Sequence, residues 1–311
     1  MQYPLKCGQS GSLCLNENNG RIYSASSFVR EYQFPEWTVV SKLCNIRHAK
    51  LCLSSNNSIL SVHNNENNLK VYNTENLQQP VFSKQWHGAT ATDLNCRFWN
   101  NDFVLMPVQH YLYAVHISDP PRIYTIYGNP NDRPRQTTRS RYGYIQSLST
   151  RNDEIAMIHY TFEPYESIFL YSKGTDVEKL EFAKKRLPGL MHSQYNNLLL
   201  HPSGGMCLFS SMKFPMLYYS TVSQDLQSPD KVVEFPRTQW PCFSPDGKYL
   251  TFTSLHLNSP IFYRCWLMDA HEWSVIKVLD REVWSPSFSS DGRYWLLPGP
   301  NPLIIDLTDL D

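Results

Sequence analysis

The feature that most constrains the fold of this sequence is a hairpin unit that recurs along the whole chain. Two late copies are plainly the same unit, Phe243-Ser-Pro-Asp-Gly-Lys-Tyr-Leu-Thr-Phe-Thr-Ser254 and Phe288-Ser-Ser-Asp-Gly-Arg-Tyr-Trp-Leu-Leu-Pro-Gly299. Each is typical of a strand, a turn and a second strand, because Asp-Gly supplies the positive φ angles that a tight hairpin needs. Weaker copies upstream raise the number of hairpins to seven, marked by the turn residues Gly20, Asn57, Asp102, Asp153, Gly205, Gly247 and Gly292.

The spacing of these turns predicts the architecture. Their mean separation is about 45 residues, the period of four-stranded propeller blades. The sequence therefore predicts an all-β fold, a single seven-bladed β-propeller with four antiparallel strands per blade. One domain over residues 1–311 is expected, with blades at 8–43, 44–88, 92–128, 142–186, 195–236, 238–280 and 283–308 plus 2–7. A two-sheet sandwich or a pair of β domains would also show many short strands, but regular spacing without a long linker favours the ring.

The strands that follow each hairpin complete the predicted blades. In the second unit, residues 69–75 and 81–86 are the third and fourth strands, and in the fourth unit residues 179–183 are the fourth strand. The seventh unit ends after its third strand. Residues 3–7 have no other partner, so we expect them to supply the missing strand and to cover the edge of an unfinished sheet.

Composition excludes several classes of protein. The 28 Lys and Arg balance the 28 Asp and Glu, 41% of residues are hydrophobic and 18% are charged. A chain this apolar and this weakly charged is globular rather than disordered. Without a basic excess, specific nucleic-acid binding is not expected. No signal peptide or membrane span is visible, so we expect a cytoplasmic protein that is a monomer on its own.

The cysteines do not indicate a metal or redox site. The eight Cys residues include no Cys-x-x-Cys pair, and reduced, buried thiols are the favoured interpretation. No cofactor and no metal are expected.

The hairpin segments resemble the WD-repeat and WD-like propellers, whose blades carry a Phe-Ser-Pro-Asp-Gly-x-x-Leu hairpin. The resemblance is strongest at residues 243–254 and 288–299 and also covers 51–75, while the Trp-Asp and Gly-His dipeptides are absent. It implies that loops after second and fourth strands open on one face, and loops after first and third strands on the other.

This alternation predicts that the balanced charges are separated between two faces. Basic residues of the loops between blades are expected on one face, where they would bind a partner: Arg133, Arg135, Arg139, Arg141, Lys184, Lys185, Arg186 and Arg47. Acidic residues gather in the opposite loops, among them Asp176, Asp225, Asp246, Asp269 and Asp291. Bidentate Arg contacts suit an acidic or phosphorylated partner. The alternative interpretation is that these charged loops are only solvated.

No catalytic motif appears in the sequence. It contains no Gly-x-Ser-x-Gly elbow, no phosphate-binding Gly-rich loop and no His-Glu-x-x-His pair. We therefore predict a non-enzymatic interaction module or scaffold for a protein partner. Two alternatives stay open: a hydrolase or lyase with a site at the central funnel, and a phosphoinositide or membrane-surface binder.

Overall fold

The computed structural model is all-β and contains seven four-stranded antiparallel sheets, the blades of a β-propeller. The structure describes residues 1–4, 9–46, 49–64, 66–86, 96–118, 120–128, 143–162, 165–187, 196–210, 216–222, 225–234, 238–255 and 263–310. The chain divides into two compact units. One comprises Met1–Asn64, Tyr72–Gln79 and Phe235–Asp311, and the other comprises Asn65–Val71 and Pro80–Glu234.

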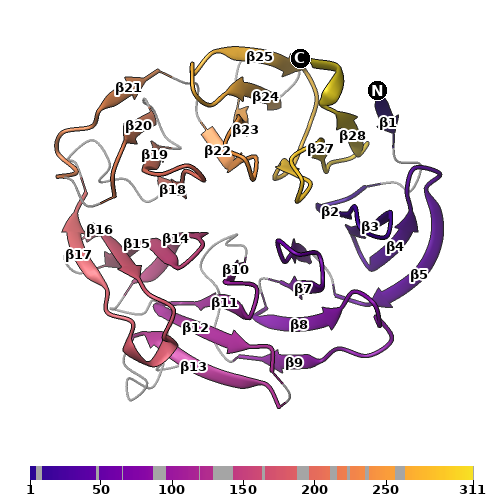
Figure 1. The fold of residues 1–311 in the computed structure, drawn as a ribbon, viewed down its shortest axis with the longest axis horizontal. Coiled ribbons are helices and arrows are strands. Elements are labelled where there is room, and N and C mark those ends of the chain that lie inside the picture. The colour runs from indigo at the N-terminus through magenta and orange to yellow at the C-terminus, as the bar shows by residue number, and fades with distance from the viewer. Residues whose placement is uncertain are drawn as a thin grey trace. The chain divides into compact units, whose positions relative to one another are not determined.

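The first unit holds three complete sheets and two strands of a fourth (Figure 1). The first blade is β2 (Ser12–Asn16), β3 (Arg21–Ala25), β4 (Val29–Gln33) and β5 (Thr38–Cys44). The sixth is β22 (Thr238–Phe243), β23 (Tyr249–Leu255), β24 (Tyr263–Asp269) and β25 (Val275–Leu279). The seventh is β26 (Ser287–Phe288), β27 (Tyr294–Leu297), β28 (Leu303–Asp306) and β1 (Gln2–Pro4).

The second unit holds three further sheets. The third blade is β10 (Arg97–Trp99), β11 (Phe103–Val108), β12 (Tyr111–His116) and β13 (Arg122–Tyr127). The fourth is β14 (Tyr144–Arg151), β15 (Glu154–Phe162), β16 (Tyr165–Lys173) and β17 (Ala183–Arg186). The fifth is β18 (Asn196–Leu200), β19 (Met206–Ser210), β20 (Met216–Tyr219) and β21 (Lys231–Val233). The second blade has strands in both units: β6 (Lys50–Leu53), β7 (Ile59–His63), β8 (Asn68–Asn73) and β9 (Phe82–Gln85).

The first strand of the chain completes the last blade, as predicted. Strand β1 pairs antiparallel with β28, with Tyr3 opposite Ile304, and the sheet order is β1-β28-β27-β26 (Figure 1). Pairing of the first residues with the last strand completes the seventh sheet and covers the edge that β28 would otherwise expose. Residues 5–7 of the predicted strand lie outside the described ranges.

Side-chain hydrogen bonds explain why the Ser-x-Asp-Gly segment forms a hairpin. Ser244 Oγ donates to Asp246 Oδ1 at 2.6 Å and accepts from the Tyr249 N–H at 2.8 Å. The same Asp246 oxygen accepts from the Lys248 N–H at 3.0 Å. The serine and the aspartate thus satisfy backbone donors of the turn, as Asx and ST turns do.

The same bonds recur in two other blades. Ser289 Oγ donates to Asp291 Oδ1 at 2.6 Å, and Ser54 Oγ donates to Asn56 Oδ1 at 2.7 Å. The residue after this aspartate or asparagine has a positive φ angle, which is +77° for Gly292 and +62° for Asn57. Asn57 replaces glycine here because asparagine tolerates the left-handed region better than other side chains. The weaker upstream copy of the unit is therefore confirmed.

One predicted strand was wrong, and the strand that the structure has in its place contains three basic residues that were predicted to lie in a loop. Residues 179–183 were expected to form the fourth strand of the fourth blade, but Val177–Lys179 is a 3₁₀ turn, η1, and the strand is Ala183–Arg186. Asp176 caps η1 by accepting from the Glu178 N–H and forms an ion pair with Lys179 at 2.9 Å. Because Lys179 belongs to this turn, the strand starts at Ala183, four residues later than predicted.

Adjacent sheets of the second unit are joined by both apolar and polar contacts. Ile145 of β14 packs with Leu105 and Leu112 of the third blade. On the other side of β14, the Oγ atoms of Ser147 and Ser149 accept from N–H groups of β18, at 2.9 Å each. Because the register shifts between Ile145 and Ser147, Ile145 and Leu148 face one neighbouring blade while Ser147 and Ser149 face the other.

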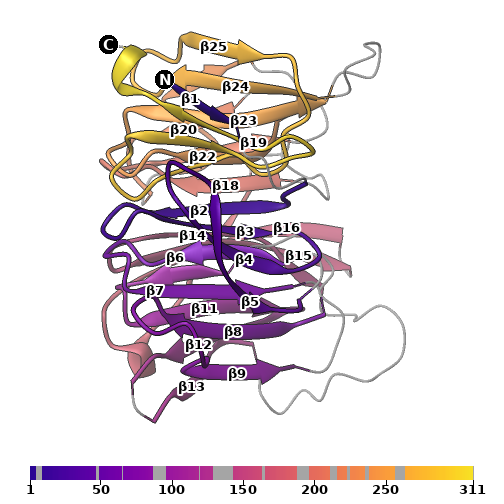
Figure 2. The same ribbon diagram turned by 90° about the vertical axis from the view of Figure 1, so that its right-hand side faces the viewer.

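Within each sheet the connections alternate between two ends, as can be followed for β2 to β5 in Figure 2. Loops after first and third strands share one end, here called the hairpin end. Loops after second and fourth strands share the opposite end, here called the crossover end. This arrangement determines where each candidate site residue lies on its blade.

Candidate functional site

The arginines predicted to bind a partner cannot be placed on the fold. Arg47, Arg133, Arg135, Arg139 and Arg141 all lie outside the described residues. The last four of these arginines lie between two described strands in the sequence. They belong to the connection from β13, which ends at Tyr127, to β14, which begins at Tyr144.

The three remaining predicted residues lie in a strand and not in a loop. Lys184, Lys185 and Arg186 belong to β17, the outermost strand of the fourth blade, where Arg186 pairs with Ile168 of β16. The loop assignment was wrong because η1 shifts the strand toward the C-terminus. Arg186 still lies toward the crossover end, where Tyr144 begins β14.

These three cations have different environments. Lys185 Nζ donates to the Val222 carbonyl oxygen at 3.1 Å, and burial lowers its pKa. Arg186 Nε pairs with Glu166 Oε1 at 2.8 Å. Lys184 is exposed, and within the described ranges no hydrogen bond or ion pair holds its ammonium group. Lys184 is consequently the member of this run that is available to a partner.

A buried histidine lies beneath this part of the sheet. His159 of β15 is 7% exposed, and its ring lies 5.6 Å from the Tyr127 ring. Burial lowers the pKa of His159 to about 4, and the charges of His110 and Lys184 act in the same direction. Among the described residues, none forms a hydrogen bond with Nε2 of His159. The imidazole is therefore neutral at pH 7.

Most of the carboxylates predicted for the opposite face accept hydrogen bonds from the backbone of their own turns. Asp246 and Asp291 accept N–H groups of their own hairpins. Asp269 accepts from the N–H groups of His271 and Glu272, at 2.8 Å each, and hydrogen bonding to the backbone lowers its pKa. These carboxylates stabilise turns, and a binding function is not needed to explain them.

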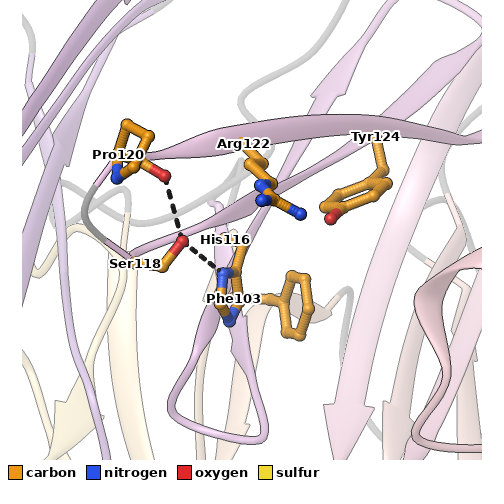
Figure 3. A pocket seen from close by; sticks show the side chains of 6 residues that line it. All are labelled: Phe103, His116, Ser118, Pro120, Arg122 and Tyr124. Carbon is orange, nitrogen blue, oxygen red and sulfur yellow. Dashed lines mark hydrogen bonds between the residues drawn. The ribbon is translucent and has the colours of Figure 1, made fainter.

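Sequence reasoning missed a pocket at the hairpin end of the third blade (Figure 3). Its volume is about 320 Å³. The lining residues come from three strands and one loop: Phe103, His116, Ser118, Pro120, Arg122 and Tyr124. The sequence gives only a weak signal for it, because residues from β11, β12 and β13 meet through the strand register.

The register aligns three of these side chains in one row. Phe103 is opposite His116, and His116 is opposite Arg122. The ring centroids of Phe103 and His116 are 4.7 Å apart, and those of Phe103 and Tyr124 are 6.3 Å apart. Arg122 is exposed, and no described residue forms an ion pair with its guanidinium. Asp119, next to Ser118 in the chain, lies outside the described ranges.

The histidine and the serine of the pocket do not form a nucleophile and base pair. Ser118 Oγ donates to the Pro120 carbonyl oxygen at 3.0 Å, so its proton is already used. The 2.7 Å contact between His116 Nδ1 and Ser118 Oγ then has the imidazole as donor. A similar local contact joins His201 Nδ1 and Ser203 Oγ at 2.8 Å in a hairpin turn. Each of these contacts joins two residues that are two positions apart in the same turn.

The described residues contain no group of three or more His, Cys, Asp or Glu side chains that could hold a metal ion. None of the helices among them is long and apolar enough to cross a membrane.

Comparison with known proteins defines the class of fold. The chain is similar to the β-propeller domain of Cps50 (Swd1) from Myceliophteria thermophila, with a TM-score of 0.71 and 12% identity over 98% of this chain and 99% of that one. It is also similar to a chain of the mitotic checkpoint complex, with a TM-score of 0.66 and 12% identity over 96% and 89% of the two chains.

The fold is thus that of a seven-bladed β-propeller, as predicted. No protein-family model matches the chain, and no match was found among curated protein sequences. Membership of the WD-repeat family stays a prediction from the hairpin residues.

Proposed function

We propose that this chain is a non-enzymatic interaction module that binds an acidic or phosphorylated segment of a protein partner. The observation that carries the proposal is the exposed Lys184 on the outermost strand of the fourth blade. It lies in a run of three basic residues, of which Arg186 is nearest the crossover end. The connection from β13 to β14, with Arg133, Arg135, Arg139 and Arg141, joins β14 at that same end.

The chemistry of these residues supports an anionic partner. Arginine binds carboxylate and phosphate through two parallel hydrogen bonds, and a cluster of such cations steers an acidic partner toward the surface. The internal pairs already formed by Lys185 and Arg186 position the outer strand. Lys184 and the arginines of the connection would then supply the contacts to the partner.

A binding measurement with defined peptides tests the proposal. Fluorescent peptides of glutamate and of phosphoserine should bind the wild-type chain with an affinity that falls as salt rises. Reversal of Arg133, Arg135, Arg139 and Arg141 to Glu should weaken binding at least tenfold, and Lys184→Glu should weaken it a few-fold. The melting temperature of Lys184→Glu should change little, because this side chain is exposed.

Two control variants separate the site from general electrostatics. Lys231→Glu reverses an exposed cation at the start of outer strand β21 and should leave binding unchanged. Replacement of the four arginines by lysine keeps the charge and should retain part of the affinity. Equal loss of binding in Lys231→Glu and Lys184→Glu would refute this location of the site.

A further inference from the structure

We propose that the pocket of the third blade binds an aromatic oxyanion, that is, a phosphate or carboxylate carried on an aryl ring. The proposed contacts come from Phe103, His116, Arg122 and Tyr124 (Figure 3). The pocket lies at the hairpin end of its sheet and shares no residue with the basic run of β17 in the next blade. This inference is therefore independent of the proposed function.

The first argument is the charge of the pocket, which favours an anionic ligand. His116 and Arg122 are directly opposite each other on β12 and β13, so their side chains lie on one face of the sheet. No carboxylate is among the residues that line the described part of the pocket. Arg122 is therefore the cation with which an oxyanion in the pocket would pair.

The second argument is the set of hydrogen-bond donors. The guanidinium of Arg122 is exposed and presents a planar fork that matches two oxygens of a phosphate or carboxylate. His116 uses Nδ1 on Ser118, at 2.7 Å, as the dashed line in Figure 3 marks. Its Nε2 forms no hydrogen bond with a described residue and can exchange one with a ligand.

The third argument is the aromatic wall. Phe103 and Tyr124 lie edge to face with an interplanar angle of 62°, and the Phe103 ring also contacts the His116 ring. A bound aryl ring would stack or pack edge-on against these side chains, which are favourable geometries for aromatic pairs. An oxyanion without a ring would leave this apolar wall unused.

The size of the pocket limits the ligand. A volume of about 320 Å³ lies at the lower end of the usual range for small-molecule sites, roughly 300–1,000 Å³. It has room for one aryl ring with its charged group. A phosphorylated tyrosine side chain and a free aromatic acid share this chemistry.

Titration of phenyl phosphate in a buffer without phosphate, followed by the NMR signals of the His116 ring, tests the inference. We expect saturable shifts in the wild-type chain. Arg122→Gln should weaken binding at least tenfold, while Arg122→Lys, which keeps the charge but not the fork, should weaken it less. Lys231→Gln, a change at the equivalent first position of β21, should have no effect.

Other ligands define what the pocket recognises. Inorganic phosphate should bind more weakly than phenyl phosphate, because it makes no contact with Phe103 and Tyr124. Benzoate reports on the carboxylate form, and a phosphotyrosine peptide that binds more tightly than phenyl phosphate would identify a peptide as the source. Absence of saturable shifts at His116 with phenyl phosphate would overturn the proposal. Equal affinities of the wild type and a folded Arg122→Gln variant would also overturn it.

Discussion

Arg151→Met should lower the free energy of unfolding by about 3 to 5 kcal/mol, the usual cost of leaving a buried charge without its partner. Arg151 forms an ion pair with Glu154, and their side chains are 13% and 10% exposed. Its Nη1 also donates to the carbonyl oxygens of His201 and Gly205 in the next blade, at 2.5 and 3.0 Å. One side chain thus joins the hairpins of two sheets within the second unit.

The loss in this variant comes mainly from Glu154. Without Arg151 its carboxylate would keep the Tyr171 hydroxyl at 2.6 Å and Lys173 Nζ at 4.0 Å, but no close cation. The double variant Arg151→Met with Glu154→Gln should therefore be more stable than Arg151→Met alone. Urea unfolding followed by circular dichroism measures these differences.

Arg293→Met is the matched control for this prediction. Arg293 pairs with Asp306 at 2.8 Å, but its side chain is 49% exposed. Asp306 would retain the Thr308 hydroxyl at 2.7 Å and the Thr308 N–H at 3.1 Å. We expect a cost of about 1 kcal/mol or less, as for other partly exposed pairs. Equal costs for Arg151→Met and Arg293→Met would contradict the role given to Arg151.

Stability should fall below neutral pH because of His159. Burial holds the pKa of this histidine at about 4 in the folded chain, against about 6.5 in an unfolded one. The unfolded state therefore binds more protons between these values. The contribution of His159 is fully present above about pH 6.5 and is lost as the pH falls toward 4, with a total of about 3 kcal/mol.

His159→Phe isolates this contribution, because the ring contact with Tyr127 is kept and the titrating group is removed. The charged or titratable groups that act on His159 are His110 and Lys184. The free energy of unfolding, measured at pH 7.5, 6 and 5, should decline less steeply in the variant. A variant and a wild type with the same slope would exclude His159 as a source of the acid sensitivity.

The fold was predictable from sequence because its local rules are simple. Ser244 and Asp246 satisfy the donors of their own turn, so the segment predicts a hairpin without reference to the rest of the chain. The closing strand was predictable from counting, since the seventh unit lacked a fourth strand. In contrast, η1 depends on the cap of Asp176 and on packing of Val177, and an apolar pattern alone does not reveal it.

The sites were less predictable because they depend on register. Phe103, His116 and Arg122 are separated in the sequence and meet only through two strand pairings. Arg151 and Glu154 flank one turn, which the sequence does suggest, but the carbonyl oxygens that Arg151 contacts belong to residues about 50 positions later. Such contacts require knowledge of which strands are neighbours and in which alignment.

Site-specific crosslinking tests the central claim, an interaction surface for an acidic or phosphorylated partner near Lys184, most directly. A photoreactive amino acid at position 184 and a control at position 231 would each be introduced into the full chain in cells. We expect position 184 to capture a protein through a segment rich in Asp, Glu or phosphorylated residues, and we expect no such capture from position 231. Capture of the same segments from both positions, or of segments without such residues from position 184, would contradict it.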